Sequence, residues 1–379
     1  MEKICFLAVD IGTSFIKAAV YDLSGNQLAV TQVPVQSDST QAGIFLQSAD
    51  DIYNDVLSAL RGISGLIGEK KDRIEAICFT GQMAGFMGAG PHWEDVTSWS
   101  CSLDTRYAPY ADEQIRTFGT DFLEISGTNG PVMAPKISWL MREFPEQAEK
   151  TAKYMLISSY VIGRLGRSDI EEAAVSSSYI TWTGLADIRE NTWSRDLCGR
   201  LGIPAEKLPK IVNYDTVVGK LSEEAARAVS LPSGIPLVAG AGDKIAGCIG
   251  AGILTPGNVT FEASSYAAVS VLADAYRPNM ERRDYDAIPA LEEHQFYLHR
   301  YFPGSGITLQ WFIDTFSGKE NPSVNVFKEI ESLTEKVPVG SEDLLAVGML
   351  GGSAMPFDGI NSGVWTGKHS ASIALIQIK

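Results

Sequence analysis

The chain has 379 residues, of which 45% are hydrophobic and 20% are charged, and its formal net charge is −15. This length predicts two domains, and the composition is typical of a folded globular protein, not of a disordered or membrane-embedded one. The negative charge repels nucleic acids and anionic membranes, and no local basic patch offsets it, so the sequence predicts no nucleic-acid partner and no membrane partner.

The sequence shows no sign of export, of disulfides or of a histidine metal site. No apolar run is long enough to span a bilayer, and the first residues lack the features of a signal peptide, so we expect a cytoplasmic protein. The five cysteines are scattered without C-x-x-C spacing, which indicates neither a disulfide framework nor a zinc site. The four histidines are equally dispersed.

The first part of the chain predicts three strands, a helix and a fourth strand. Short apolar runs bounded by turn residues indicate strands at 5–9, 15–21, 27–34 and 74–79. Apolar residues at helical spacing predict a helix through 52–60, with Asp50 or Asp51 as its N-cap. The fourth strand leads into Gln82 and Met83. Polar groups therefore follow the first and fourth strands, at the sheet edge where α/β proteins bind ligands.

The tip of the first predicted hairpin carries polar groups. Asp10 ends the first strand, Gly12, Thr13 and Ser14 form the turn, and Lys17 lies in the second strand. Glycine lets the backbone approach a ligand closely, and amides, hydroxyls and a lysine suit a phosphate. The alternative is an ordinary β-turn in which the aspartate caps its own backbone.

The middle of the chain is predicted to be mainly helical over 107–200, with amphipathic runs at 137–144 and 154–165. A strand at 235–239 then leads through three small residues to Asp243, and a helix rich in small residues follows. An aspartate at this place is explained equally well as a helix N-cap.

A second hairpin is predicted further along the chain, from strands at 258–261 and 266–272 that flank Ser264 and Ser265. Its polar tip resembles that of the first hairpin, which suggests two related α/β halves that face each other.

Four polar sites together indicate phosphoryl transfer: the turn that follows Asp10, the end of the fourth strand at Gln82, the pair Asp104 and Arg106, and Asp243. Alone, each is explained by helix capping, by hydrogen bonds to backbone groups at a strand end, or by a surface ion pair. Together they offer a phosphate loop, a carboxylate for a metal, polar groups for a hydroxylated acceptor and a separate base.

Three rival motifs are not matched. The chain has no G-x-x-x-x-G-K-[ST] phosphate loop, and Ile245 stands where the dinucleotide fingerprint needs its third glycine, which disfavours an NAD-dependent dehydrogenase. Gly304-Ser305-Gly306 is not the G-x-S-x-G of a nucleophile elbow.

The segments AVDIGTSFIKAAVYD, TGQMAGF, LDTR, APKISWL and VAGAGDKIAGCIGAG occur in this order between residue 8 and residue 252. In them the chain resembles the FGGY carbohydrate kinases, and most of all the xylulokinase-like pentulose kinases. These belong to the actin-like, Hsp70-like ATPase superfamily. The resemblance implies a ribonuclease H-like α/β fold with two related domains around a cleft. It also implies ATP-dependent phosphorylation of a sugar or polyol hydroxyl with Mg²⁺, a pentulose such as xylulose being the expected acceptor.

The resemblance also implies roles for individual residues. Asp10 matches the catalytic carboxylate near the metal, and Asp243 matches the general base, which also contacts the sugar. The expected phosphate-binding groups are Gly12, Thr13, Ser14, Lys17, Ser264 and Ser265. The expected sugar-binding groups are Gln82, Met83, Asp104 and Arg106.

Three residues depart from the family pattern. Ala84 replaces a histidine that xylulokinases commonly have, which leaves the identity of the sugar open. Ala263 replaces a glycine of the second phosphate loop and would crowd a phosphate if its φ were positive. Lys244 either lowers the pKa of Asp243 or points away from it.

The resemblance divides the chain into a sugar-binding domain over 1–245 and a nucleotide-binding domain over 246–379. The family continues beyond the point that matches the end of this chain, so we expect an incomplete second domain that lacks part of the nucleotide pocket. A non-catalytic sugar- or nucleotide-binding relic is the alternative function. Apolar surface exposed in this way would favour association, and a homodimer is a possible state.

Overall fold

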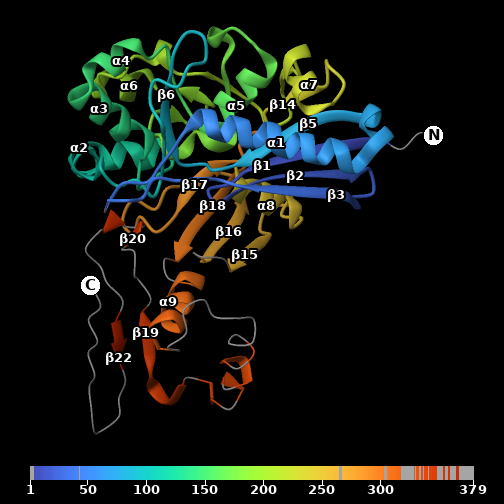
Figure 1. Ribbon diagram of the computed structural model, residues 1–379. Helices are drawn as coiled ribbons and strands as arrows, with labels where there is room; N and C mark the ends of the chain where they lie inside the picture. The colour runs from blue at the N-terminus through green and yellow to red at the C-terminus, as the bar shows by residue number, and fades with distance from the viewer. Residues whose placement is uncertain are drawn as a thin grey trace.

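The computed structural model describes residues 4–41, 43–263, 267–302 and 305–316, together with short segments between 328 and 366. Figure 1 shows the chain as far as residue 250 as a large α/β body, with the strands of residues 259–302 as a second sheet below it. The helices are α1 (Ala49–Ile67), α2 (Ala108–Ser126), α3 (Met133–Glu143), α4 (Pro145–Lys150), α5 (Ile157–Gly166), α6 (Arg195–Leu201), α7 (Glu223–Val229), α8 (Asp243–Gly250) and α9 (Gly306–Phe316).

The largest sheet has the strand order β13-β14-β5-β1-β2-β3. Its strands are β1 (Cys5–Ile11), β2 (Phe15–Asp22), β3 (Gln27–Pro34), β5 (Ile74–Gly81), β13 (Val217–Lys220) and β14 (Pro236–Val238). The first three form an antiparallel meander, whereas β5 runs parallel to β1 and β14 runs parallel to β5. The predicted strands of this region are therefore confirmed, and the first extends two residues further than expected.

A second sheet has the order β15-β16-β18-β17. Its strands are β15 (Val259–Ala263), β16 (Ala267–Ala273), β17 (Asp286–Pro289) and β18 (Phe296–Phe302). β15, β16 and β18 pair antiparallel in this order, as β1, β2 and β3 do, but β17 comes between β16 and β18 in the chain and pairs at the far side of β18. The predicted second hairpin is confirmed, while its tip residues Ser264 and Ser265 lie outside the described residues.

The remaining strands form smaller sheets. A four-stranded sheet joins β4 (Leu46–Gln47), β7 (Trp99–Cys101), β6 (Gly85–Ala89) and β8 (Lys153–Met155). The two-stranded pairs are β9 (Ala174–Ser176) with β12 (Lys210–Val212), β10 (Ala186–Asp187) with β11 (Thr192–Trp193), β19 (Leu345–Val347) with β22 (Val364–Thr366), and β20 (Ser353–Ala354) with β21 (Phe357–Asp358).

Two local predictions were wrong. The N-cap of α1 is Ser48, whose hydroxyl accepts a hydrogen bond from the Asp51 amide at 3.1 Å, while Asp50 pairs with Arg164 at 2.6 Å. The amphipathic run at 154–165 divides into β8 and α5, because a short apolar run fits a buried strand as well as a helix.

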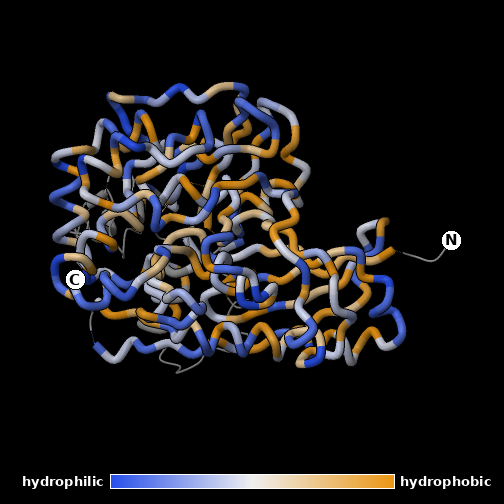
Figure 2. The backbone as a smooth tube through the Cα atoms, turned by 90° about the horizontal axis from the view of Figure 1, so that it is seen from above, coloured by the Kyte–Doolittle hydropathy of each residue, from blue (hydrophilic) through white to orange (hydrophobic). Residues whose placement is uncertain are grey.

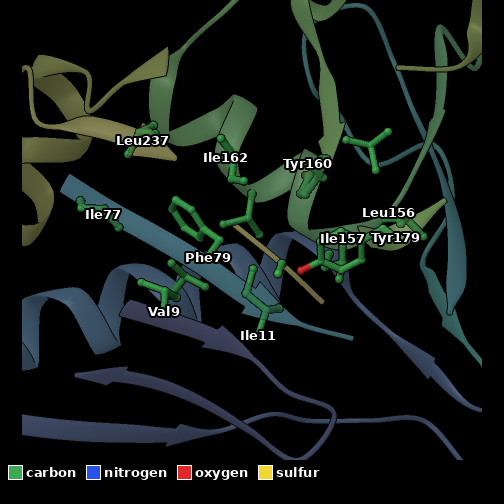
Figure 3. Close-up of a cluster of buried hydrophobic side chains, with 14 of the residues drawn as sticks. Val9, Ile11, Ile77, Phe79, Leu156, Ile157, Tyr160, Ile162, Tyr179 and Leu237 are labelled. Atoms are coloured by element: carbon green, nitrogen blue, oxygen red, sulfur yellow. The ribbon is translucent and has the colours of Figure 1, made fainter. Parts of the chain in front are cut away.

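A hydrophobic core between the main sheet and α5 holds the ends of the strands. Figure 3 shows Val9 and Ile11 of β1, Phe79 of β5 and Leu237 of β14 in one cluster with Ile162 of α5, and all five are buried. Seen from above, hydrophobic stretches run through the middle of the molecule, and hydrophilic ones are frequent in the peripheral loops (Figure 2). Among the described residues, no helix has the length and apolarity that crossing a bilayer requires.

The second sheet is joined to the first part of the chain along β17. The Ala287 amide donates to the Gly127 carbonyl at 2.8 Å, and the Thr181 hydroxyl donates to the Ala287 carbonyl at 2.8 Å. Asp286, which is buried, accepts from Trp182 Nε1 at 2.7 Å and from the Asn129 amide at 2.8 Å. These bonds fix one edge of the second sheet. The domain boundary at 245/246 stays a prediction.

Candidate active site

Three neighbouring strands bring distant polar residues to one edge of the main sheet. β1, β5 and β14 are parallel, so their carboxyl ends meet there. Asp10 is paired with Thr80 across β1 and β5, and the Gln82 amide donates to the Ile11 carbonyl at 3.1 Å. The Ala241 amide donates to the Phe79 carbonyl at 3.2 Å, which places the start of α8 at the same edge.

The turn between β1 and β2 is held through its carbonyl groups. A Cβ at Gly12 would lie 2.7 Å from the Phe15 carbonyl oxygen, so the turn requires glycine. The Gly12 carbonyl accepts from Gln82 Nε2 at 3.3 Å, and the Thr13 carbonyl accepts from Gln47 Nε2 at 2.8 Å. Because both bonds use carbonyl oxygens, they orient the turn without occupying its N–H groups. Ser14, at the end of the turn, is exposed.

Gln82 is a connecting residue in this structure. Its side chain is 7% exposed, and its Oε1 accepts from Trp99 Nε1 at 3.0 Å while Nε2 also lies 3.3 Å from Gln47 Oε1. Sequence reasoning missed both Gln47 and Trp99, because neither lies in a motif and only the fold brings them to Gln82. The sugar-binding role of Gln82 stays a prediction.

Asp10 remains accessible at the end of β1. Its side chain is 34% exposed, and its Oδ2 lies 3.7 Å from Lys17 Nζ on β2. Partial burial raises the pKa of Asp10, and Lys17 opposes this change. No group of three or more His, Cys, Asp or Glu side chains suited to a metal occurs in the described part of the chain. Mg²⁺ bound to nucleotide phosphates needs only one or two carboxylates, so Asp10 fits such an ion.

Asp243 is the first residue of α8, and the N-cap is Gly242. Its Oδ1 accepts a hydrogen bond from the Lys244 amide at 2.8 Å. Solvent reaches the side chain, yet the surrounding protein is dense enough that burial raises the pKa of Asp243 to about 6. The negative charges of Asp10 and Glu262 act in the same direction, while Lys244 opposes them. A carboxylate with this pKa suits general base catalysis near neutral pH.

Lys244 reaches across to the second sheet. Its Nζ lies 2.6 Å from Glu262 Oε1 on β15, so this ion pair ties α8 to the second hairpin. The lysine lowers the pKa of Asp243, but burial of the carboxylate outweighs it. Ala263, the last residue of β15, has extended backbone and pairs with Ala267, so its Cβ is accommodated without a positive φ.

Met83 packs beneath the turn that precedes Asp243. It is 4% exposed, and a Cβ at Gly242 would lie between 2.3 and 2.7 Å from three of its side-chain atoms. Ala84, next in the chain, is half-buried. The structure thus places Met83 next to the start of α8.

Asp104 and Arg106 form a tight pair beside β7. Asp104 is 1% exposed and accepts from Arg106 Nε at 2.9 Å, from Arg106 Nη2 at 2.7 Å and from Ser100 Oγ at 2.7 Å. Burial alone would raise the pKa of Asp104, but these hydrogen bonds and the charge of Lys136 hold it below its ordinary value. Of the pair, Arg106 is the partly exposed member, at 29%.

Residues 5–250 match the model of the FGGY family of carbohydrate kinases, N-terminal domain. The chain belongs to this FGGY family. It is 26% identical to a xylulose kinase of Bacillus subtilis over 360 residues, which cover 92% of this chain and 68% of that protein. It is 25% identical to an autoinducer-2 kinase of Salmonella paratyphi A, covering 90% of this chain and 66% of that one.

The crystal structure of gluconate kinase from Lactobacillus acidophilus has the same fold, with a TM-score of 0.87 and 22% identity. The match covers 97% of this chain and 73% of that one. The predicted fold class is therefore confirmed as the α/β fold of FGGY kinases. The chain spans about two thirds of the length of the curated relatives described above.

Proposed function

We propose that this FGGY protein transfers the γ-phosphoryl group of ATP to a hydroxyl of a sugar or polyol, with Asp243 as general base. The observation that carries the proposal is the Asp243 carboxylate. It is open to solvent, has a pKa raised to about 6, and lies at the sheet edge that also holds Asp10 and the Gly12 turn. Family membership supports the same reaction class.

In this reaction the acceptor hydroxyl oxygen forms a bond to the γ-phosphorus, and the bond from that phosphorus to the β–γ bridging oxygen breaks. Asp243 accepts the hydroxyl proton, and ADP leaves with the bridging oxygen. A base whose pKa is near the working pH combines a large deprotonated fraction with useful basicity. The high pKa of Asp243, compared with an ordinary aspartate, therefore favours this role.

The turn after β1 would bind phosphate through the amides of Gly12, Thr13 and Ser14, with Lys17 as a nearby cation. Asp10 would hold Mg²⁺, which supplies neutralisation of phosphate charge when it is bound. We also assign Ser264 and Ser265 to a second phosphate loop by their place in the second hairpin; both lie outside the described residues.

The acceptor that we propose is a pentulose such as xylulose, bound near Met83 and Arg106. The relatives and structural neighbours of this chain include kinases of xylulose, gluconate and autoinducer-2, so these three compounds form the test set. A screen measures the melting temperature with each compound, with and without Mg-ATP, and then ADP release for every hit. Acceptor-dependent ADP release supports a kinase. Sugar binding without turnover refutes the proposal and favours a non-catalytic relic.

The pH dependence of kcat/KM should show the pKa of the base. Below about pH 6 Asp243 becomes protonated and cannot accept the hydroxyl proton, so kcat/KM is expected to fall about tenfold per pH unit there. Steady-state rates between about pH 4.5 and 8 measure this limb. An acidic limb near 4, where an ordinary aspartate titrates, would contradict the assignment.

Lys244→Met should move that acidic limb to higher pH. The variant removes a positive charge that lowers the pKa of Asp243 and leaves the negative charge of Glu262 without its ion pair. Both changes favour the protonated form of Asp243, so activity is lost at a higher pH than in the wild type. Lys220→Met, at an exposed position of β13, is the control and should leave the limb in place. An unmoved limb would show that Lys244 does not act on the base, and a limb at lower pH would contradict the expected direction.

A cytoplasmic location and a homodimeric state stay predictions. Light scattering coupled to size-exclusion chromatography measures the mass of the native particle, and a monomer would refute the dimer.

A further inference from the structure

Lys136 is a completely buried lysine on α3. Its Nζ donates to Ser100 Oγ at 2.6 Å and to the carbonyls of Cys101, Ser100 and Asp104 at 2.7, 3.1 and 3.3 Å. Burial lowers its pKa to about 7, although the charge of Asp104 opposes this change. A buried ammonium has a large desolvation penalty, which an apolar side chain of similar length would avoid. Packing alone therefore does not explain a lysine at this position.

All of these acceptors lie in the segment that leads to Arg106. Ser100 Oγ accepts from Lys136 and donates to Asp104 Oδ2 at 2.7 Å. Asp104 in turn binds the Arg106 guanidinium at two points, Nε and Nη2. The contacts form a continuous relay from Lys136 through Ser100 and Asp104 to Arg106.

The same helix also holds Arg106 directly. Trp139 lies three residues after Lys136 on α3, and the Arg106 guanidinium carbon is 4.8 Å from the centre of its ring. Asp104 uses two of the five N–H donors of Arg106, and the side chain is 29% exposed. The guanidinium is thus fixed on one edge and one face, with donors left for oxygen atoms of a ligand.

We propose that Lys136 is a positioning residue for acceptor binding, which fixes through Ser100 and Asp104 the direction in which Arg106 presents its N–H donors. The inference rests on the proposed function, because it takes the acceptor to be the ligand of Arg106. It predicts that loss of the ammonium weakens acceptor binding and leaves ATP binding and the chemical step nearly intact.

The test uses Lys136→Met, which keeps the length of the side chain and removes its charge. We expect the KM for the acceptor to rise about tenfold, with the KM for ATP unchanged and kcat within about threefold. Lys153→Met is the matched control. Lys153 is also buried, but its Nζ donates to the Glu206 backbone carbonyl and pairs with the Glu171 carboxylate, away from the relay, so the acceptor KM of this variant should not change. Ser100→Ala interrupts the same relay if Lys136→Met fails to fold.

A double-mutant cycle separates positioning from a structural role. If Lys136 acts through Arg106, adding Lys136→Met to Arg106→Met should change the acceptor KM less than about twofold. If the two substitutions raise the acceptor KM by factors that multiply in the double variant, Lys136 acts independently of Arg106 and the inference is overturned. An unchanged acceptor KM in Lys136→Met would also overturn it.

Crystal structures of the wild type and Lys136→Met give a readout that needs no turnover. We expect Arg106 to leave the Trp139 ring in the variant, and an unmoved Arg106 would overturn the inference. A wild type that phosphorylates no acceptor, with Arg106 displaced in the variant, would refute the proposed function alone.

Discussion

Asp243→Asn is expected to bind its acceptor sugar but to phosphorylate it about 10²–10⁴ times more slowly than the wild type. Asparagine keeps the shape of the side chain and its bond from the Lys244 amide, but it cannot accept the hydroxyl proton at neutral pH. The loss should therefore fall on kcat. Steady-state ADP formation measures kcat, and calorimetric titration with the acceptor measures binding.

Asp196→Asn is the matched control for this variant. Asp196 also lies in the first turn of a helix, α6, and its carboxylate pairs with Arg200 at 3.0 Å on the exposed surface. An exposed ion pair of this kind contributes little to stability, so activity should stay close to that of the wild type. Full activity of Asp243→Asn would show that another group takes the proton.

Gly240→Ala should reduce the free energy of unfolding by about 2–6 kcal/mol. Gly240 has a φ of 69°, and a Cβ there would lie 1.8 Å from the Phe79 carbonyl oxygen. The variant has to adopt a strained backbone and push β14 away from β5. Because the Ala241 amide bonds to that same carbonyl, the start of α8 moves as well. Chemical denaturation followed by circular dichroism measures the loss.

Gly234→Ala separates the cost of the strained backbone from the cost of the contact with the Phe79 carbonyl. Gly234 has a φ of 81°, but nothing lies within 4 Å of a Cβ built there. It should therefore lose only the strain of the left-handed conformation, about 1–2 kcal/mol. Equal losses at the two positions would mean that the contact with Phe79 contributes nothing, and the account of the β14–β5 junction would be wrong.

The sequence predicted those parts of the fold that depend on local pattern. Strands such as 27–34 have short apolar runs between turn residues, and the structure confirms them. The Ser48 cap of α1 was missed because Asp50 and Asp51 are equally good capping residues, and only the position of the first helical turn decides between them. The boundary between β8 and α5 was missed because both segments are buried and apolar.

The candidate site could be predicted only as a set of residues. That Asp10, Gln82 and Asp243 meet at one edge follows from parallel strand ends, which the pattern of strands and helices indicated. Some of the side chains that contact these three residues belong to parts of the chain outside the motifs. Gln47 and Trp99 hold Gln82, and neither belongs to a recognisable motif.

The same limit applies to the electrostatics. Whether Lys244 weakens the proposed base depends on Glu262, which lies on the hairpin after α8 and pairs with the lysine amine. The sequence left both orientations of Lys244 open for this reason. Burial, which dominates the pKa of Asp243, is a property of the whole fold and has no local sequence signal.

The parallel pairing of β14 with β5 has a consequence for how the protein folds during synthesis. The meander β1-β2-β3 needs only neighbouring residues, whereas β14 lies more than 150 positions after β5. Contacts between distant residues form slowly, and the earlier part of a chain leaves the ribosome first. The segment that contains β14 and Asp243 therefore joins a sheet that is already formed. A nascent chain that ends before this segment lacks the proposed base. Pulsed hydrogen exchange should show amides of β1–β3 protected before those of β14.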